Sequence, residues 1–164
     1  MNISRTVIAA VVILVIGAIA YAAYSFNSDD FASETPVKLY YYNPALDQGP
    51  GGVQCSRQGL VAVNRAIPET TMPLTKAIEL LLRGEITPQE QAQGIESEFP
   101  LAGVALTSAV VEAGVATLTF ADPQNKTSGG SCRVAILRAQ IEETAKQFET
   151  VESVRLMPEE VFQP

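Results

Sequence analysis

The stretch PLTKAIELLLRGEITPQE, residues 73–90, decides the fold of this 164-residue chain. Its first half has the spacing of an amphipathic helix, whose apolar side must be buried against other elements. Thr71 is expected to cap this helix, and Gly84 is expected to end it. Thr87 and Glu90 form a capping-box pattern, which predicts a second, short helix. The apolar side of the first helix consists of Leu74, Ala77, Ile78, Leu81 and Leu82.

Short runs of apolar and β-branched residues on both sides of these helices predict strands. The predicted strands are residues 37–42, 60–67, 104–111, 115–121 and 151–156. Glu112-Ala113-Gly114 joins the third and fourth as a hairpin, and residues 131–148 form a long helix. The order β-β-α-β-β-α-β predicts an α+β fold, with one mixed sheet and helices packed on one of its faces. The domain is expected to cover residues 37–157, with a polar tail at 158–164.

The sequence also predicts the surroundings of several individual side chains. Arg65 falls on the apolar side of its strand, and we interpret it as an ion-paired or edge residue. Tyr40 and Tyr42 are expected on the outer face of their strand, packed beneath a loop or a neighbouring element, with a stacking platform as the alternative. Glu142 and Lys146 stand four residues apart on the long helix, which predicts a surface ion pair.

The N-terminal run VIAAVVILVIGAIAYAAY, residues 7–24, contains no charged side chain. As a helix it would extend roughly 27 Å, close to the thickness of a bilayer's hydrocarbon core. Arg5 precedes it and Asp29 and Asp30 follow it, so residues 1–6 are expected in the cytoplasm and the domain outside. Residues 25–36 are polar, end in proline and predict a linker. This interpretation makes the chain a single-pass protein of the cell membrane with one N-terminal transmembrane helix.

A cleaved signal peptide is the alternative interpretation of the same run. Ala18-Ile19-Ala20 and Ala20-Tyr21-Ala22 both resemble cleavage sites between small residues. The apolar run is longer than signal peptides usually have, which favours the anchor. Under either interpretation the domain is exported, and under the second it is secreted.

The chain has two cysteines, Cys55 and Cys132, and each follows a glycine-rich stretch. An exported compartment favours disulfides, so we expect the two to be bonded to each other. Closing a loop of about 80 residues would stabilise the fold by roughly 4–5 kcal/mol on the chain-entropy model. The alternative makes Cys132 a nucleophile at a helix N-terminus, but no histidine is present to act as its base.

Charge and composition argue against several functions. From Asp29 onward the chain has eighteen acidic residues against ten of its eleven Lys and Arg, a net charge of −8, which disfavours a nucleic-acid surface. Histidine is absent, and with it the commonest general base and metal ligand. No nucleotide-binding, metal-binding or hydrolase motif is found. We therefore expect no catalytic residue, no metal site and no cofactor.

The sequence resembles the GerMN domain, a module of sporulation and spore germination. The resemblance rests on the first two predicted strands, the helix and capping box of residues 73–90, the hairpin around Gly114, and the last helix and strand. It covers about residues 37–156, and the two cysteines are departures from it. The resemblance implies an exported domain without established catalytic residues, with a fold similar to ring-building motifs of envelope machines.

Two functions of different classes follow. The first is a membrane-anchored, extracytoplasmic, non-enzymatic module that binds an envelope protein or further copies of itself, in sporulation or germination. The second is a domain that binds peptidoglycan or a small ligand between the two glycine loops, where backbone amides could hold an anion. The loop residues of that expected site are Gly51, Gly52, Gly129, Gly130 and Ser131, beside Cys55 and Cys132.

Overall fold

The computed structural model describes Val15, Ile16 and residues 34–48 and 54–164. Two compact units are distinguished, residues 1–33 and Glu34–Pro164, and the second is described below. The predicted span at 7–24 lies outside the described residues except for Val15 and Ile16, which are helical. Among the residues described, no helix has the length and apolar character needed to cross a bilayer.

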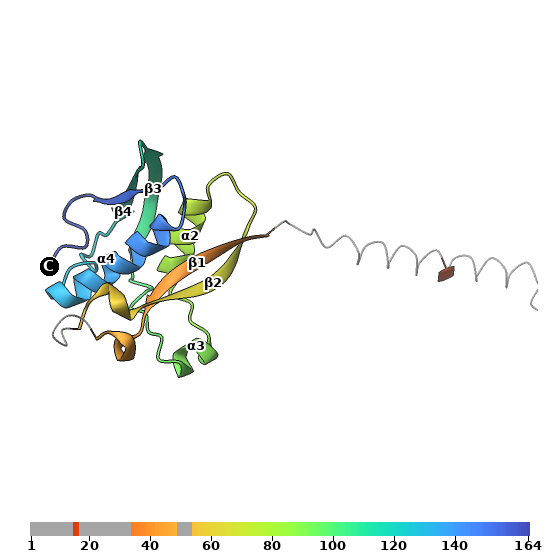
Figure 1. The fold of residues 1–164 in the computed structure, drawn as a ribbon. Helices are drawn as coiled ribbons and strands as arrows, with labels where there is room; N and C mark the ends of the chain where they lie inside the picture. The colour runs from red at the N-terminus through yellow and green to blue at the C-terminus, as the bar shows by residue number, and fades with distance from the viewer. Residues whose placement is uncertain (1–14, 17–33, 49–53) are drawn as a thin grey trace, which may run out of the picture. The chain divides into compact units, whose positions relative to one another are not determined.

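The unit from Glu34 to Pro164 is an α+β fold whose elements follow the predicted order (Figure 1). The strands are β1 (Glu34–Tyr42), β2 (Leu60–Pro68), β3 (Ala105–Glu112), β4 (Val115–Ala121) and β5 (Ser153–Met157). The helices are α2 (Pro73–Leu82), α3 (Pro88–Ala92) and α4 (Ser131–Lys146), with short 3-10 turns η1 (Pro44–Leu46) and η3 (Arg57–Gly59).

The strands form two sheets, whereas the sequence predicts one. β1 and β2 pair as an antiparallel ribbon, while β3, β4 and β5 form a mixed sheet with one antiparallel and one parallel pairing. Side chains of α4 occupy the free edge of β1, because the Lys38 N–H donates to Gln147 Oε1 (2.7 Å) and the Tyr40 N–H donates to Thr144 Oγ1 (3.1 Å). A strand of the other sheet therefore cannot pair there.

The two long helices contact each other and both sheets, so the prediction of helices on one face of one sheet is wrong. α2 packs against β1 and β3, and α4 packs against β1 and β5. The apolar stripe of α2 is buried as predicted. On α4, burial extends beyond the predicted apolar positions to Gln140 and Thr144, since both sides of the helix are covered.

The helix ends follow the sequence except at the start of α2 and at the end of α4, which ends at Lys146 instead of residue 148. Met72, not Thr71, is the N-cap residue of α2, and no side chain bonds its first turn. Gly84 ends the helix at φ +64°, and a Cβ there would overlap the carbonyl of Phe99. The capping box of Thr87 and Glu90 is present at the start of α3.

The domain is longer at both ends than residues 37–157. β1 begins at Glu34, so the last residues of the predicted linker are strand. Val161 and Phe162 of the predicted polar tail are buried in the core. The Phe162 ring packs edge-on against Phe120 at 5.2 Å between centroids, and its N–H donates to Thr127 Oγ1. Burial of these two apolar side chains outweighs the polar character of their neighbours.

Candidate functional site

The predicted disulfide is present and joins the loop before β2 to the first turn of α4. The Cα atoms of Cys55 and Cys132 are 5.2 Å apart, although 77 positions separate them in the sequence. Cys132 is therefore a bonded sulfur in this structure and not a free thiol. Cys55 has φ +77°, a conformation that residues with a side chain seldom adopt.

Asp47 organises the loop beneath the disulfide. Its carboxylate accepts hydrogen bonds from the Ser56 hydroxyl, the Tyr42 hydroxyl (2.6 Å) and the Ser56 N–H (2.7 Å). These bonds, that from the Ser56 hydroxyl above all, hold the pKa of Asp47 well below its usual range. Tyr42 is buried beneath the loop as predicted. The sequence offered no signal for Asp47, because its partners are brought to it by the loop's path.

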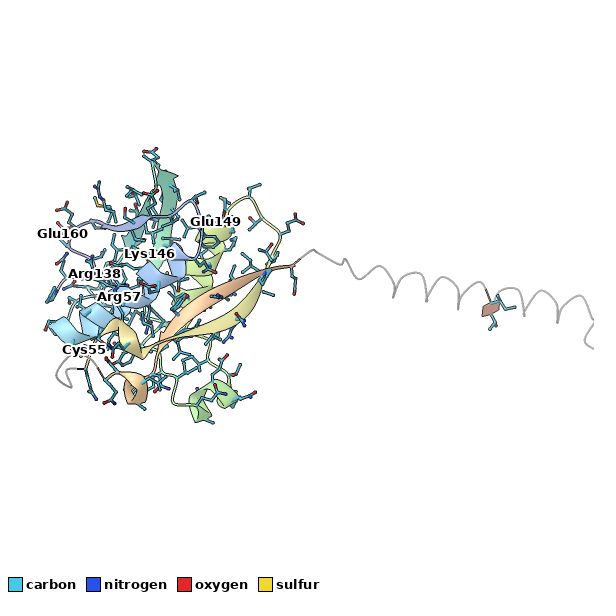
Figure 2. The ribbon with its side chains drawn as sticks, in the orientation of Figure 1. Cys55, Arg57, Arg138, Lys146, Glu149 and Glu160 are labelled. Atoms are coloured by element: carbon cyan, nitrogen blue, oxygen red, sulfur yellow. A yellow bond between two sulfur atoms is a disulfide. The ribbon has the colours of Figure 1, made fainter. Side chains whose placement is uncertain are left out.

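A groove of about 350 Å³ borders the disulfide on the side of α4. Figure 2 labels Cys55, Arg57 and Arg138, which are among its lining residues. Arg57 and Arg138 both line it, and both bond Glu142, which lies on α4. Arg57 also bonds Glu143. In place of the predicted Lys146, Glu142 pairs with Arg57 of η3 and with Arg138, which lies one turn earlier on α4. Two guanidinium groups face two carboxylates here, so the charges of the groove are balanced.

The predicted glycine loops are seen in part. Gly51 and Gly52 lie outside the described residues. Gly130 is the N-cap residue of α4, without a side-chain bond to the helix, and Ser131 is the first residue of that helix. Gly129 precedes them at φ +155°. The disulfide holds this helix start against Cys55, so the two cysteine-bearing loops do meet.

The Arg133 side chain lies across this helix start. Its guanidinium donates to the Ser128 carbonyl and pairs with Glu98. The positive charge of Arg133, in the first turn of α4, is therefore already engaged by an acidic partner.

A second, smaller hollow of about 170 Å³ lies on the other side of α4, lined by Tyr42, Glu96, Leu137 and Gln140 among others. Gln140 is 1% exposed, and its Oε1 has no hydrogen-bond partner among the described residues. The sequence does not predict the burial of Gln140, because a single polar residue in a helix is ordinarily expected on the solvent side.

The carboxylates with clearly shifted pKa values are weaker bases than usual. Arg65 forms a two-point ion pair with Glu90, at 2.8 Å for both bonds, which confirms the prediction for Arg65. Mainly through this pair, the pKa of Glu90 is lowered to about 2. The pKa of Asp122 is also lowered, because burial, which would raise it, is outweighed by N–H and hydroxyl bonds from Lys126 and Thr127.

Metal-ligating side chains do not gather in the part of the chain that the structure describes: no three of its His, Cys, Asp and Glu residues are arranged to hold an ion.

Three comparisons relate this geometry to known proteins. Residues 38–160 match the family Germane, described as sporulation and spore germination. The tandem GerMN domains of the sporulation protein GerM from Bacillus subtilis share the fold, at a TM-score of 0.55 and 21% identity, over 81% of this chain and 43% of that one. The first GerMN domain of the same protein gives 0.50 and 17%, over 74% and 80%. This chain thus spans less than half of the tandem structure. No curated protein matches.

Proposed function

Because the chain belongs to the Germane family of sporulation and spore-germination domains, we propose that it is a membrane-anchored, extracytoplasmic, non-enzymatic module for protein association in the cell envelope. Under this proposal residues 7–24 hold it in the membrane with the N-terminus in the cytoplasm. Its partners are an envelope protein or further copies of itself.

The disulfide is the main observation that supports an extracytoplasmic location for the domain. Disulfides persist in oxidising compartments and are rare in the cytosol. Here one ties the loop before β2 to α4, and Asp47 and Tyr42 are organised around it. A domain that contains such a bond is suited to the outer side of the membrane, in agreement with the charges that flank residues 7–24.

The chemistry of the described side chains supports association over catalysis. A general base works best with a pKa near the operating pH. The chain has no histidine, and the pKa values of Asp47, Glu90 and Asp122 are displaced downward, away from neutrality. Their partners are structural groups of the same domain.

The groove beside the disulfide supports a second candidate, the binding of peptidoglycan or another wall component. Its two guanidinium groups could exchange their carboxylate partners for an acidic group of the ligand. This exchange would leave Glu142 and Glu143 without partners, and we therefore place it second.

Two measurements on full-length protein test the proposal. Protease added to intact spheroplasts is expected to digest residues 37–164 while cytoplasmic markers survive. Amine-reactive crosslinking in membranes is expected to give a self-crosslinked species or a defined partner band. Full protection of the domain would contradict the topology.

A wall-binding role is separated from association by a sedimentation assay with purified peptidoglycan. The association proposal predicts that the protein stays in the supernatant. Cosedimentation that Arg57→Ala and Arg138→Ala abolish, together with the absence of any crosslink, would replace association by the second candidate.

A further inference from the structure

Three of the four exposed large apolar side chains that the structure describes from Glu34 onward lie on or beside β3. Met72 and Val111, 56% and 37% exposed, line one hollow between the start of α2 and β3. Val110, 46% exposed, is on the opposite face of the strand, and the fourth, Leu46, lies apart in η1. Clustered exposed apolar side chains mark interaction surfaces more often than single ones do.

β3 is an edge strand whose outer backbone groups are unpaired. It pairs with β4 through a two-residue turn, Ala113-Gly114, in which both residues have positive φ. In such a hairpin, alternate residues exchange hydrogen bonds with the partner strand, beginning at Glu112 and Val115. Ala109 and Val111 therefore direct their N–H and C=O groups away from β4, where the described residues offer no partner.

The same edge borders a groove. In Figure 1 β3 lies between β4 and α2. Two hollows are lined by residues of both β3 and α2. The first, about 210 Å³, is lined by Met72, Phe148, Ala109 and Val111. The second, about 340 Å³, continues beside Leu106. An extended segment of another chain that lies along β3 can therefore form backbone hydrogen bonds with the strand and place apolar side chains in these hollows.

The other strand edges are obstructed or interrupted by charge. The edge of β1 is bonded by Thr144 and Gln147 of α4. On β2 the Arg65 guanidinium donates to the outward carbonyl of Asn64 (3.0 Å). β5 has only five residues with Arg155 at its centre. Charged residues, short length and covering side chains are ways in which proteins prevent edge pairing. Between Ala105 and Val111 β3 has no charged residue, and its outer backbone groups accept or donate no bond that the structure describes. A bulge, which is a further device of this kind, interrupts it between Leu106 and Ser108 and leaves Ser108–Glu112 in regular pairing.

We propose that β3 is the surface on which a second copy of this chain docks, by antiparallel pairing of the two β3 strands about a two-fold axis near Ala109. The proposal names the site and partner of the association proposed above and rests on it. The two mixed sheets then become one continuous sheet, and Val110 and Val111 of both copies are covered at the seam.

Charge favours β3 as the place where two copies of the chain can meet. The chain carries a net charge of −7, so two copies repel each other over most of their surfaces. The segment Ala105–Val111 contains no charged side chain, and like-charge repulsion is therefore smallest where two β3 edges meet. An edge strand is also complementary to itself, because rotation about Ala109 sets its N–H against the C=O of the other copy.

Cysteine crosslinking of full-length protein in membranes tests the docking surface. Val110→Cys introduces the only free thiol at the seam, and Asn64→Cys introduces one on the exposed face of β2 as a matched control. A short bifunctional thiol reagent is expected to give at least ten times more dimer from V110C than from N64C. Similar yields from the two variants would overturn the proposal.

Ala109→Pro on the V110C background removes the outward N–H while leaving the hydrogen bonds to β4 in place. It is expected to reduce the dimer at least tenfold, with the Cys55–Cys132 bond and the unfolding midpoint retained. If A109P does not fold, Val111→Lys on the same background is the second variant, with the same expected loss. Unchanged dimer in the folded variant would overturn the proposal.

The outcomes separate this inference from the proposed function. If amine-reactive crosslinks between copies persist in A109P, the protein associates but β3 is not the docking site. The same conclusion follows if V110C crosslinks only to another protein. The absence of every crosslink removes both.

Discussion

Tyr41 and Tyr42 are neighbours on β1, yet their hydroxyl groups have opposite surroundings. Tyr41 is fully buried, and its Oη has no hydrogen-bond partner among the described residues. Burial raises the pKa of Tyr41 to about 12. Tyr42 Oη donates to Asp47 at 2.6 Å. An unsatisfied buried polar group costs free energy, whereas a satisfied one contributes a small net gain.

Removing each hydroxyl should therefore change stability in opposite directions. Tyr41→Phe is expected to leave the free energy of unfolding unchanged or to raise it by about 1 kcal/mol. Tyr42→Phe is expected to lower it by about 1–2 kcal/mol, because the Asp47 carboxylate loses a donor. Urea denaturation of the two variants measures this. A loss of stability in Y41F equal to that in Y42F would show that Tyr41 Oη has a partner.

The Arg65–Glu90 pair predicts a dependence of stability on pH. The pKa of Glu90 is lowered from 4.5 to about 2, so its contribution is complete above about 4.5 and is lost as the pH falls toward 2. Glu90→Gln is expected to lower the free energy of unfolding by about 1–3 kcal/mol at pH 7. The difference between wild type and E90Q should shrink as the pH falls through that window. A difference that is constant with pH would contradict the ion pair.

At the scale of elements, the end of α2 depends on one glycine. Gly84 has φ +64°, and a Cβ there would lie 1.8 Å from the Phe99 carbonyl oxygen. Gly130 at the start of α4 has φ −63° and nothing within 4 Å of an added Cβ. The two glycines therefore provide a matched test of steric and conformational constraint.

Gly84→Ala is expected to destabilise the domain by about 3 kcal/mol or more, since backbone would have to move and the φ value is unfavourable for alanine. Gly130→Ala is expected to change stability by less than about 1 kcal/mol. Thermal and urea unfolding of both variants provide the comparison. A mild effect at Gly84 would mean that the segment around Phe99 adapts easily.

At the scale of the whole molecule, the disulfide joins parts that are far apart in sequence. Removing a cross-link between residues 77 positions apart frees the unfolded chain, at a cost of about 4 kcal/mol on the chain-entropy model. The double variant Cys55→Ser/Cys132→Ser is expected to lose about that much stability. Wild type in a thiol reductant should match it, which controls for the substitutions. A loss below about 1 kcal/mol in both would mean that the loop is held without the disulfide.

The sequence by itself determined the elements of this domain. The apolar stripe of α2, the glycine at its end, the capping box at Thr87 and the hairpin around Gly114 are local patterns, whose physical causes lie within a few residues. The pairing of Cys55 with Cys132 was predictable because only two cysteines are present. The Germane family was likewise recognisable from the order of these elements.

Only the tertiary structure determines which strands pair, which side chains enter the core and which polar groups bond each other. The sequence does not show that Thr144 and Gln147 bond the edge of β1, so it predicts one sheet where two are present. It also places Phe162 in a polar tail, although that ring belongs to the core. Asp47 and Glu142 find their partners across loops that only the fold brings together. Most of these contacts depend on the path of a loop or join residues far apart in the chain, so local sequence patterns do not predict them.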